Sequence, residues 1–221
     1  MILPAPNRTE KSGGGVFMDG DRIIISIGRK YGSGGREIGK RLAKELGIDF
    51  YDKELITLAA KESGFSEEIL KENDENHNGS FLYSIVMGTY TGGNNLPLNH
   101  KLFLAQFDTI KKLASEKSCV IIGRCADYAL EYDPNCVKVF IHADIDSRIR
   151  RAVEEYGVDP DKVEDVIKKT DKKRESYYNF YTGRKWGLME NYDLTINSSV
   201  SGIDGAVEII AQLVKEKLKK K

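Results

Sequence analysis

The chain has 221 residues and no net charge, since 34 Lys plus Arg balance 34 Asp plus Glu. This length suits one α/β domain, and the charge balance gives no reason to expect a nucleic-acid or membrane partner. The three cysteines are odd in number and lack C-x-x-C spacing, so we expect reduced thiols in a cytoplasmic protein. They form no zinc-ligand spacing with the histidines, and we predict no metal ion bound directly by protein side chains.

The N-terminal part of the chain predicts a leader followed by a strand, a glycine-rich loop and a helix. Residues 1–20 have no hydrophobic periodicity and no signal-peptide pattern, so we expect a flexible leader. A strand at 23–27 precedes the glycines, and an amphipathic helix at 36–46 follows them. Because this order gathers backbone N–H groups at a helix N-terminus, it favours phosphate binding. The alternative is a glycine-rich turn without a ligand.

The remaining elements alternate between strand and helix. Strands are predicted at 48–51, 118–122, 137–141 and 193–196, and helices at 53–62, 102–113, from Asp144 or Asp146, from about 161, and at 205–218. This alternation predicts a three-layer α/β fold in which helices cover both faces of a parallel sheet. Residues 21–221 would form a single domain, with an insertion rich in glycine and asparagine at about 53–100 and a lid at about 157–188.

The glycine loop departs from the usual phosphate-binding pattern, G-x-x-x-x-G-K followed by Ser or Thr. When the loop is aligned on Gly32-Ser33-Gly34, Gly35 occupies the lysine position and Arg36 the hydroxyl position. Gly28 lies one residue too early to be the first glycine. The loop can still cradle a phosphate with its backbone, whereas the cation must come from elsewhere. The nearest cations are Arg29, Lys30 and Arg36.

Ligands of parallel sheets bind where the strands end, and polar residues follow two of the predicted strands. Arg124 follows the strand at 118–122 and can bind a phosphate or carboxylate, or it can pair with Asp127 to brace the loop. Asp52 follows the second strand and suits a sugar hydroxyl, a base amine or a metal-bound water. The alternative role of Asp52 is to cap the next helix.

The predicted lid combines cations with aromatic residues. Arg174 lies in a basic cluster, and the segment after it contains Tyr177, Tyr178, Tyr181, Arg184, Lys185 and Trp186. Cations that close over phosphates suit phosphoryl transfer, because positioning and charge stabilisation provide most of its catalysis. The alternative is an aromatic-rich surface that makes a homodimer contact.

Segments spread along the chain resemble the cytidylate kinase-like family, namely Ile25–Gly39, Asp49–Asp52, Val120–Asp127 and Lys173–Trp186. The resemblance covers roughly residues 22–215. It implies a P-loop nucleoside monophosphate kinase with a core, an acceptor-binding insertion and a lid. ATP and Mg²⁺ are the cofactors that it implies.

The resemblance also implies roles for individual residues. Arg124 corresponds to the Gly-Arg-Asp segment that holds CMP, with Cys125 in place of the aspartate and Asp127 as the nearest substitute. Asp171-x-x-Arg174 is similar to the lid motif. The P-loop lysine and the threonine that follows it are absent, since Gly35 and Glu37 take their positions. The residues expected around the ATP phosphates are Gly32, Ser33, Gly34, Gly35, Arg36 and Glu37.

We therefore expect an ATP-dependent kinase that phosphorylates a nucleotide such as CMP or dCMP. Arg36 or Lys30 would replace the lysine, and the transferring phosphate would be gathered by Arg148, Arg151, Arg174 and Arg184. The acceptor would contact Asp52, Arg124 and Asp127. Two alternatives remain, a non-catalytic nucleotide-binding or regulatory protein and a kinase of a small non-nucleotide metabolite.

Overall fold

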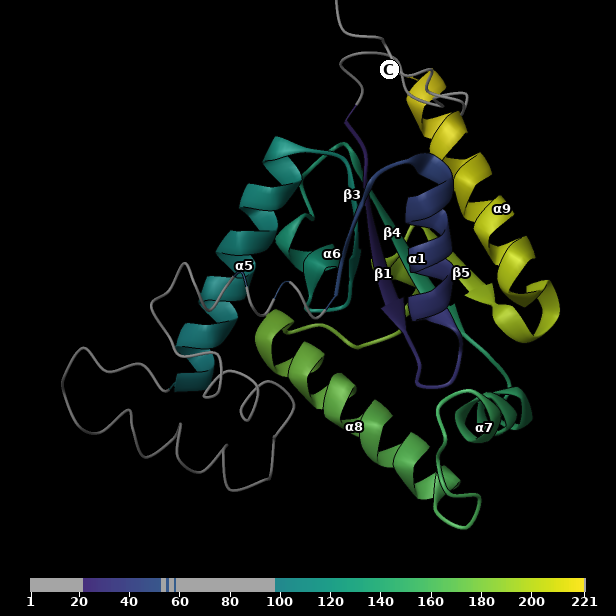
Figure 1. Cartoon of the computed structure of the whole chain (residues 1–221). Coiled ribbons are helices and arrows are strands. Elements are labelled where there is room, and N and C mark those ends of the chain that lie inside the picture. The colour runs from purple at the N-terminus through teal and green to yellow at the C-terminus, as the bar shows by residue number, and fades with distance from the viewer. Residues whose placement is uncertain (1–21, 53–54, 56–57, 59–97, 221) are drawn as a thin grey trace, which may run out of the picture.

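The computed structural model of the chain describes residues 22–52, 55, 58 and 98–220 (Figure 1). The predicted leader lies outside these residues, as do most of the predicted helix at 53–62 and nearly all of the predicted insertion. Within the described residues, the five strands form one parallel sheet in the order β2-β3-β1-β4-β5. The strands are β1 (Ile24–Arg29), β2 (Asp49–Tyr51), β3 (Cys119–Ile122), β4 (Cys136–His142) and β5 (Leu194–Asn197).

Helices cover both faces of this sheet, which confirms the predicted three-layer architecture (Figure 1). Two of them, α1 and α9, pack on one face, and α5 and α6 pack on the other. The described helices are α1 (Gly35–Leu46), α5 (Leu98–Glu116), α6 (Ala126–Ala129), α7 (Ile145–Glu154), α8 (Val163–Thr182) and α9 (Ser198–Lys219), with a 3₁₀ turn η1 (Met189–Asn191).

The central strand β1 explains why both faces are covered. Ile25 and Ile27 face α1 and α9, while Ile24 faces α5 and α6, and all three side chains are fully buried. Burying one isoleucine side chain contributes about 1.5–3 kcal/mol, so an uncovered face of this strand would be unstable in water. Because successive side chains of β1 point to opposite faces and both sets are apolar, the strand is stable only between two helical layers.

The helix ends follow local backbone chemistry. Gly47 ends α1 with φ at 66°, and Gly183 ends α8 in the same left-handed conformation with φ at 68°. The last helix begins earlier than predicted, at Ser198, because the Asn197 side chain accepts a hydrogen bond from the Ser199 N–H at 3.0 Å. The chain is kinked at Gly202, and the predicted helix corresponds to the part that follows this kink.

One helix lies beyond the ends of the strands rather than on a face of the sheet. Figure 1 shows α8 crossing below the carboxyl ends of the strands, next to the loop that joins β1 to α1. None of the described helices is long and apolar enough to cross a membrane.

Candidate functional site

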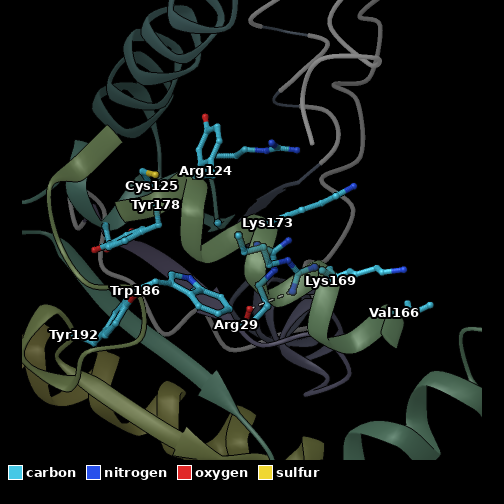
Figure 2. A pocket seen from close by; sticks show the side chains of 15 residues that line it. Arg29, Arg124, Cys125, Val166, Lys169, Lys173, Tyr178, Trp186 and Tyr192 are labelled. Carbon is cyan, nitrogen blue, oxygen red and sulfur yellow. Dashed lines mark hydrogen bonds between the residues drawn. The ribbon is translucent and has the colours of Figure 1, made fainter. Parts of the chain in front are cut away.

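A cavity of about 250 Å³ lies where β1 and β3 end against α8 (Figure 2). Tyr178, Trp186 and Tyr192 lie on one side of it, Lys169 and Lys173 on the other. Cations and flat rings together suit a ligand that has both anionic groups and an aromatic ring. The lining comprises the cations Arg29, Arg124, Lys169, Lys173 and Arg174, the aromatic residues Tyr177, Tyr178, Trp186 and Tyr192, and Gly28, Gly123, Cys125, Asp127, Val166 and Thr170.

The glycine loop is tightly packed beside this cavity. Gly32 has φ at 76°, and a Cβ atom there would lie 2.6 Å from the Arg148 carbonyl oxygen. Gly34 has φ at 74° and leaves room for the side chain of Ile203. The buried hydroxyl of Ser33 donates a hydrogen bond to the Lys30 carbonyl oxygen at 2.8 Å. The loop residues Gly32, Ser33, Gly34 and Gly35 are all buried, outside the lining of the cavity.

The predicted substitutes for the lysine lie outside the cavity as well. The Arg36 Nε donates to an Asp52 carboxylate oxygen at 2.5 Å, and the Arg36 guanidinium lies 5.9 Å from the centre of the Phe50 ring. Asp52 therefore contacts the first turn of α1 and does not line the cavity. Glu37 accepts a hydrogen bond from the Arg41 Nε at 2.7 Å, within the same helix. Lys30 is also outside the cavity lining.

Three of the four arginines predicted to gather the transferring phosphate form ion pairs with acidic residues. Arg148 pairs with Asp171, and its Nε donates to the Tyr31 carbonyl oxygen at 2.7 Å. Arg151 pairs with Glu155 one turn along α7, and Arg184 pairs with Glu131. The structure thus places all three guanidinium groups against carboxylates, each of them outside the cavity lining.

Arg174 is the predicted lid arginine that lines the cavity. Its Nη1 donates to the Arg29 carbonyl oxygen at 3.2 Å, and its guanidinium lies 5.8 Å from the centre of the Tyr31 ring. These contacts tie the middle of α8 to the end of β1. Arg174 therefore lies at the junction of the predicted lid and the glycine loop.

The segment after β3 has strained backbone conformations at the edge of the cavity. Gly123, Arg124 and Cys125 follow one another with φ at 69°, 58° and 55°. Left-handed conformations cost about 1–2 kcal/mol for a residue with a Cβ atom, and such strain concentrates at functional sites. Here it turns Arg124 and the start of α6 toward the cavity, so the structure brings together the predicted residues Arg124, Asp127 and Arg174.

Asp127 places a buried carboxyl group in the cavity lining. Its side chain is 5% exposed and accepts a hydrogen bond from the Tyr178 hydroxyl at 2.6 Å. Burial raises the pKa of Asp127, and the hydrogen bond from Tyr178 opposes this effect. A carboxyl group of this kind can accept a hydrogen bond or a proton from a ligand.

The aromatic residues of α8 pack within the chain. The Tyr181 ring stacks on Phe103 of α5 with ring centres 4.1 Å apart, and the Tyr177 hydroxyl donates to the Gln106 side chain at 3.2 Å. These contacts attach the C-terminal half of α8 to α5. A homodimer contact through this segment stays a prediction.

Metal ligands are not clustered in the described part of the chain. No three His, Cys, Asp or Glu side chains of the described residues lie close enough together to hold a metal ion. The hydroxyl groups nearest the glycine loop belong to Ser33 and Ser198, and both donate to backbone carbonyl oxygens.

Comparison with known proteins assigns the family. Residues 24–200 match the cytidylate kinase-like family, over more than half of the chain. The chain belongs to the cytidylate kinase-like family. Like other members of this family, it has a kinase-like P-loop fold, in which the order of strand, glycine loop and helix is retained. No curated protein matches the chain.

Solved structures agree with this assignment. An uncharacterized protein from Eubacterium ventriosum ATCC 27560 is 32% identical with a TM-score of 0.67, over 87% of this cytidylate kinase-like chain and 98% of that one. A shikimate kinase from Bacteroides thetaiotaomicron has 16% identity and a TM-score of 0.52, covering 87% and 98%. A gluconokinase from Sinorhizobium meliloti 1021 has 14% identity and a TM-score of 0.51, covering 91% and 99%. At such low identity these two kinases share the fold alone.

The sequence reasoning missed several cations that line the cavity of this cytidylate kinase-like protein. Lys169 and Lys173 lie four residues apart on α8, one turn before Tyr177, so all three share one helical face. That periodicity is visible in the sequence and separates them from Lys168 and Lys172 of the same cluster, which do not line the cavity. Arg29, Lys30 and Arg36 are the cations nearest the glycine loop, and of these three Arg29 is the one that lines the cavity.

Proposed function

We propose that this protein is an ATP-dependent phosphotransferase whose acceptor is a nucleoside monophosphate such as CMP or dCMP. This proposal is supported by one observation, namely that cations from three different elements of the fold line the same cavity. Arg29 comes from the end of β1, Arg124 from the end of β3, and Lys173 and Arg174 from α8. Catalysis of phosphoryl transfer depends on cations that converge on one group from several sides.

The residues that follow β3 favour a nucleobase-containing acceptor. Asp127 can accept a hydrogen bond from an exocyclic amine, and Arg124 can donate to a ring nitrogen or carbonyl oxygen. Both residues line the cavity next to Tyr178. A nucleobase carries an exocyclic amine and hydrogen-bond acceptors on one edge. Its flat face could pack on Tyr178, Trp186 and Tyr192, which form the aromatic wall of the cavity.

ATP fits the charge of this cavity, since its phosphates would meet Arg29, Lys173 and Arg174. Mg²⁺ keeps most of its water and is commonly bound through substrate phosphates, so it would enter with ATP. When bound, Mg²⁺-ATP supplies the phosphoryl group and part of its charge neutralisation.

A second candidate is a kinase of a hydroxyl-bearing metabolite, and Asp127 is the residue that favours it. A hydroxyl acceptor benefits from a general base, whereas a phosphate acceptor is already nucleophilic. The buried Asp127 carboxyl has a raised pKa, which brings it closer to the range useful for proton transfer.

An acceptor panel distinguishes these functions. The purified protein is incubated with Mg²⁺-ATP and CMP, dCMP, UMP, AMP or small hydroxy acids, and ADP production is measured. Turnover with CMP or dCMP supports the proposal, and turnover confined to hydroxy acids supports the second candidate. ATP binding without ADP from any acceptor would instead indicate a non-catalytic nucleotide-binding protein.

We also propose a cytoplasmic location, supported by the three free thiols of Cys119, Cys125 and Cys136. Fractionation of cells that express the protein at native level tests this location. Recovery in a membrane or secreted fraction would contradict it.

A further inference from the structure

We infer that Arg29 supplies the cation of the P-loop, because the first glycine and the lysine of the motif have exchanged positions in this chain. This inference rests on the proposed function and names a residue for it. When Gly34 is aligned with the second glycine of G-x-x-x-x-G-K, the first position holds Arg29 and the last holds Gly35. A cation and a glycine are therefore both present, at opposite ends of the motif.

The two ends of the motif are adjacent in space. The loop returns α1 beside the end of β1, and a Cβ atom on Gly35 would lie 2.6 Å from the Arg29 Cβ. It would also lie 3.3 Å from the Ile141 Cβ, so the backbone of α1 has little room to move away. Only one long side chain fits between these ends. Gly35 leaves that space to Arg29, just as a glycine at the first position would leave it to a lysine at position 35.

The Arg29 side chain ends in the cavity. Its guanidinium lies against Gly123, and a Cβ atom on Gly123 would collide with the Arg29 Nη1. Gly123 has φ at 69° and is thus suited to glycine for a second reason. Figure 2 shows Arg29 between the aromatic wall and Lys169. The absence of a side chain at Gly35 leaves space for the start of the Arg29 side chain, and its absence at Gly123 leaves space for the guanidinium. We call this space the path of Arg29.

The other loop cations have different surroundings. Arg36 is 53% exposed and bonded to Asp52, and neither residue lines the cavity. Lys30 lies outside the lining of the cavity. An arginine at position 29 also offers a planar fork of donors, which binds two phosphate oxygens where a lysine binds one.

Binding of tripolyphosphate and of ATP, measured by titration calorimetry, tests the inference without requiring turnover. Arg29→Gln is expected to weaken both affinities at least tenfold. Lys44→Gln, which removes one positive charge from the exposed face of α1, is the matched control and should leave both affinities unchanged. The double variant Arg29→Gly with Gly35→Lys restores the first glycine and the lysine of the usual motif and should recover most of the lost affinity.

The outcomes separate this inference from the proposed function. If the unmodified protein binds neither ATP nor tripolyphosphate, the proposed function is wrong and the inference falls with it. If the unmodified protein binds both and Arg29→Gln binds equally well, the inference alone is overturned. A folded double variant without recovery, or a tenfold loss in Arg36→Gln but not in Arg29→Gln, also overturns it. Since the double variant keeps one cation and one glycine, it serves as the test should Arg29→Gln fail to fold.

Discussion

The Arg148 guanidinium and the Asp171 carboxylate form an ion pair that joins α7 to α8 beside the glycine loop. The same two side chains bind both backbone polar groups of Tyr31. The Asp171 Oδ1 accepts from the Tyr31 N–H at 2.8 Å, and the Arg148 Nε donates to the Tyr31 carbonyl oxygen at 2.7 Å. Helix α8, α7 and the loop are therefore held together through one residue of the loop.

This relationship predicts a large stability effect at Asp171. The two side chains of the pair are 8% and 17% exposed, so Asp171→Ala leaves a largely buried guanidinium without its carboxylate. We expect the free energy of unfolding to fall by about 3 kcal/mol, measured by urea denaturation. The control is Glu164→Ala on the same helix, which breaks an exposed pair with Lys168 and should cost less than about 0.5 kcal/mol. Equal effects of the two substitutions would contradict the role of the buried pair.

A second prediction concerns the packing of the glycine loop. Gly32→Ala introduces a Cβ atom 2.6 Å from the Arg148 carbonyl oxygen at φ of 76°. Gly157 has a similar φ of 66° but nothing within 4 Å of the corresponding position. Gly157→Ala should therefore cost only the backbone strain, about 1–2 kcal/mol, and Gly32→Ala at least about 1 kcal/mol more. Denaturation midpoints that do not differ would show that the loop can move away from α7.

A third prediction is the pH dependence of stability at Asp127. Burial raises the pKa of this carboxyl group in the folded protein above its value in the unfolded chain. The protonated carboxyl therefore stabilises the protein fully at a pH below its unfolded pKa, where it is protonated in both the folded and the unfolded state. This stabilisation is lost as the pH rises through the folded pKa. Asp127→Asn removes this loss and keeps an acceptor for the Tyr178 hydroxyl. Relative to the unmodified protein, we expect the free energy of unfolding to rise by on the order of 1 kcal/mol at pH ~7 and to be unchanged near pH ~3.

Tyr178→Phe provides the converse control for Asp127. It removes the hydroxyl that donates to the carboxylate at 2.6 Å, so the charged form of Asp127 loses a partner. The decline of stability with rising pH should then become steeper than in the unmodified protein. Thermal midpoints measured across the acidic range would refute this assignment if both variants followed the unmodified curve.

A fourth prediction concerns catalysis. Arg174→Ala should lower kcat at least tenfold in the acceptor assay with the fold intact, equivalent to about 1.4 kcal/mol or more on the barrier. Lys172→Ala removes a neighbouring charge from the exposed side of α8 and should leave kcat unchanged. An Arg174→Ala enzyme with full kcat would remove this arginine from the mechanism.

The fold was predictable because the strands are short, apolar and separated by amphipathic helices. Errors occurred where a side chain, rather than a hydrophobic pattern, decides a boundary. Asn197 starts α9 by accepting from the Ser199 N–H at 3.0 Å, so the helix begins at Ser198 rather than at the predicted residue 205. The cap residue was present in the sequence, but its pairing depends on a backbone conformation that the sequence alone does not specify.

The candidate site was predictable in part. Arg124 and Asp127 lie at the cavity because they follow β3, and Arg174 lies there because α8 crosses the ends of the strands. Arg29 could have been assigned from alternation, since it continues the face of β1 that carries Ile25 and Ile27 toward α1. The acidic partners of Arg148 and Arg184 could not be assigned, because each pair joins segments that are far apart in the sequence.

The three cysteines differ in where they lie relative to the cavity. Cys119 and Cys136 are buried in β3 and β4, where burial raises the pKa of each thiol to about 12. Cys125 is also buried with a raised pKa, but it lines the cavity. Since a thiol reacts as its thiolate, each should stay inert toward alkylating reagents until its surroundings open. The rate of labelling at Cys125 would then report movement of α8 away from the cavity. The rates at Cys119 and Cys136 would report opening of the whole sheet, so the native thiols distinguish two motions of one protein.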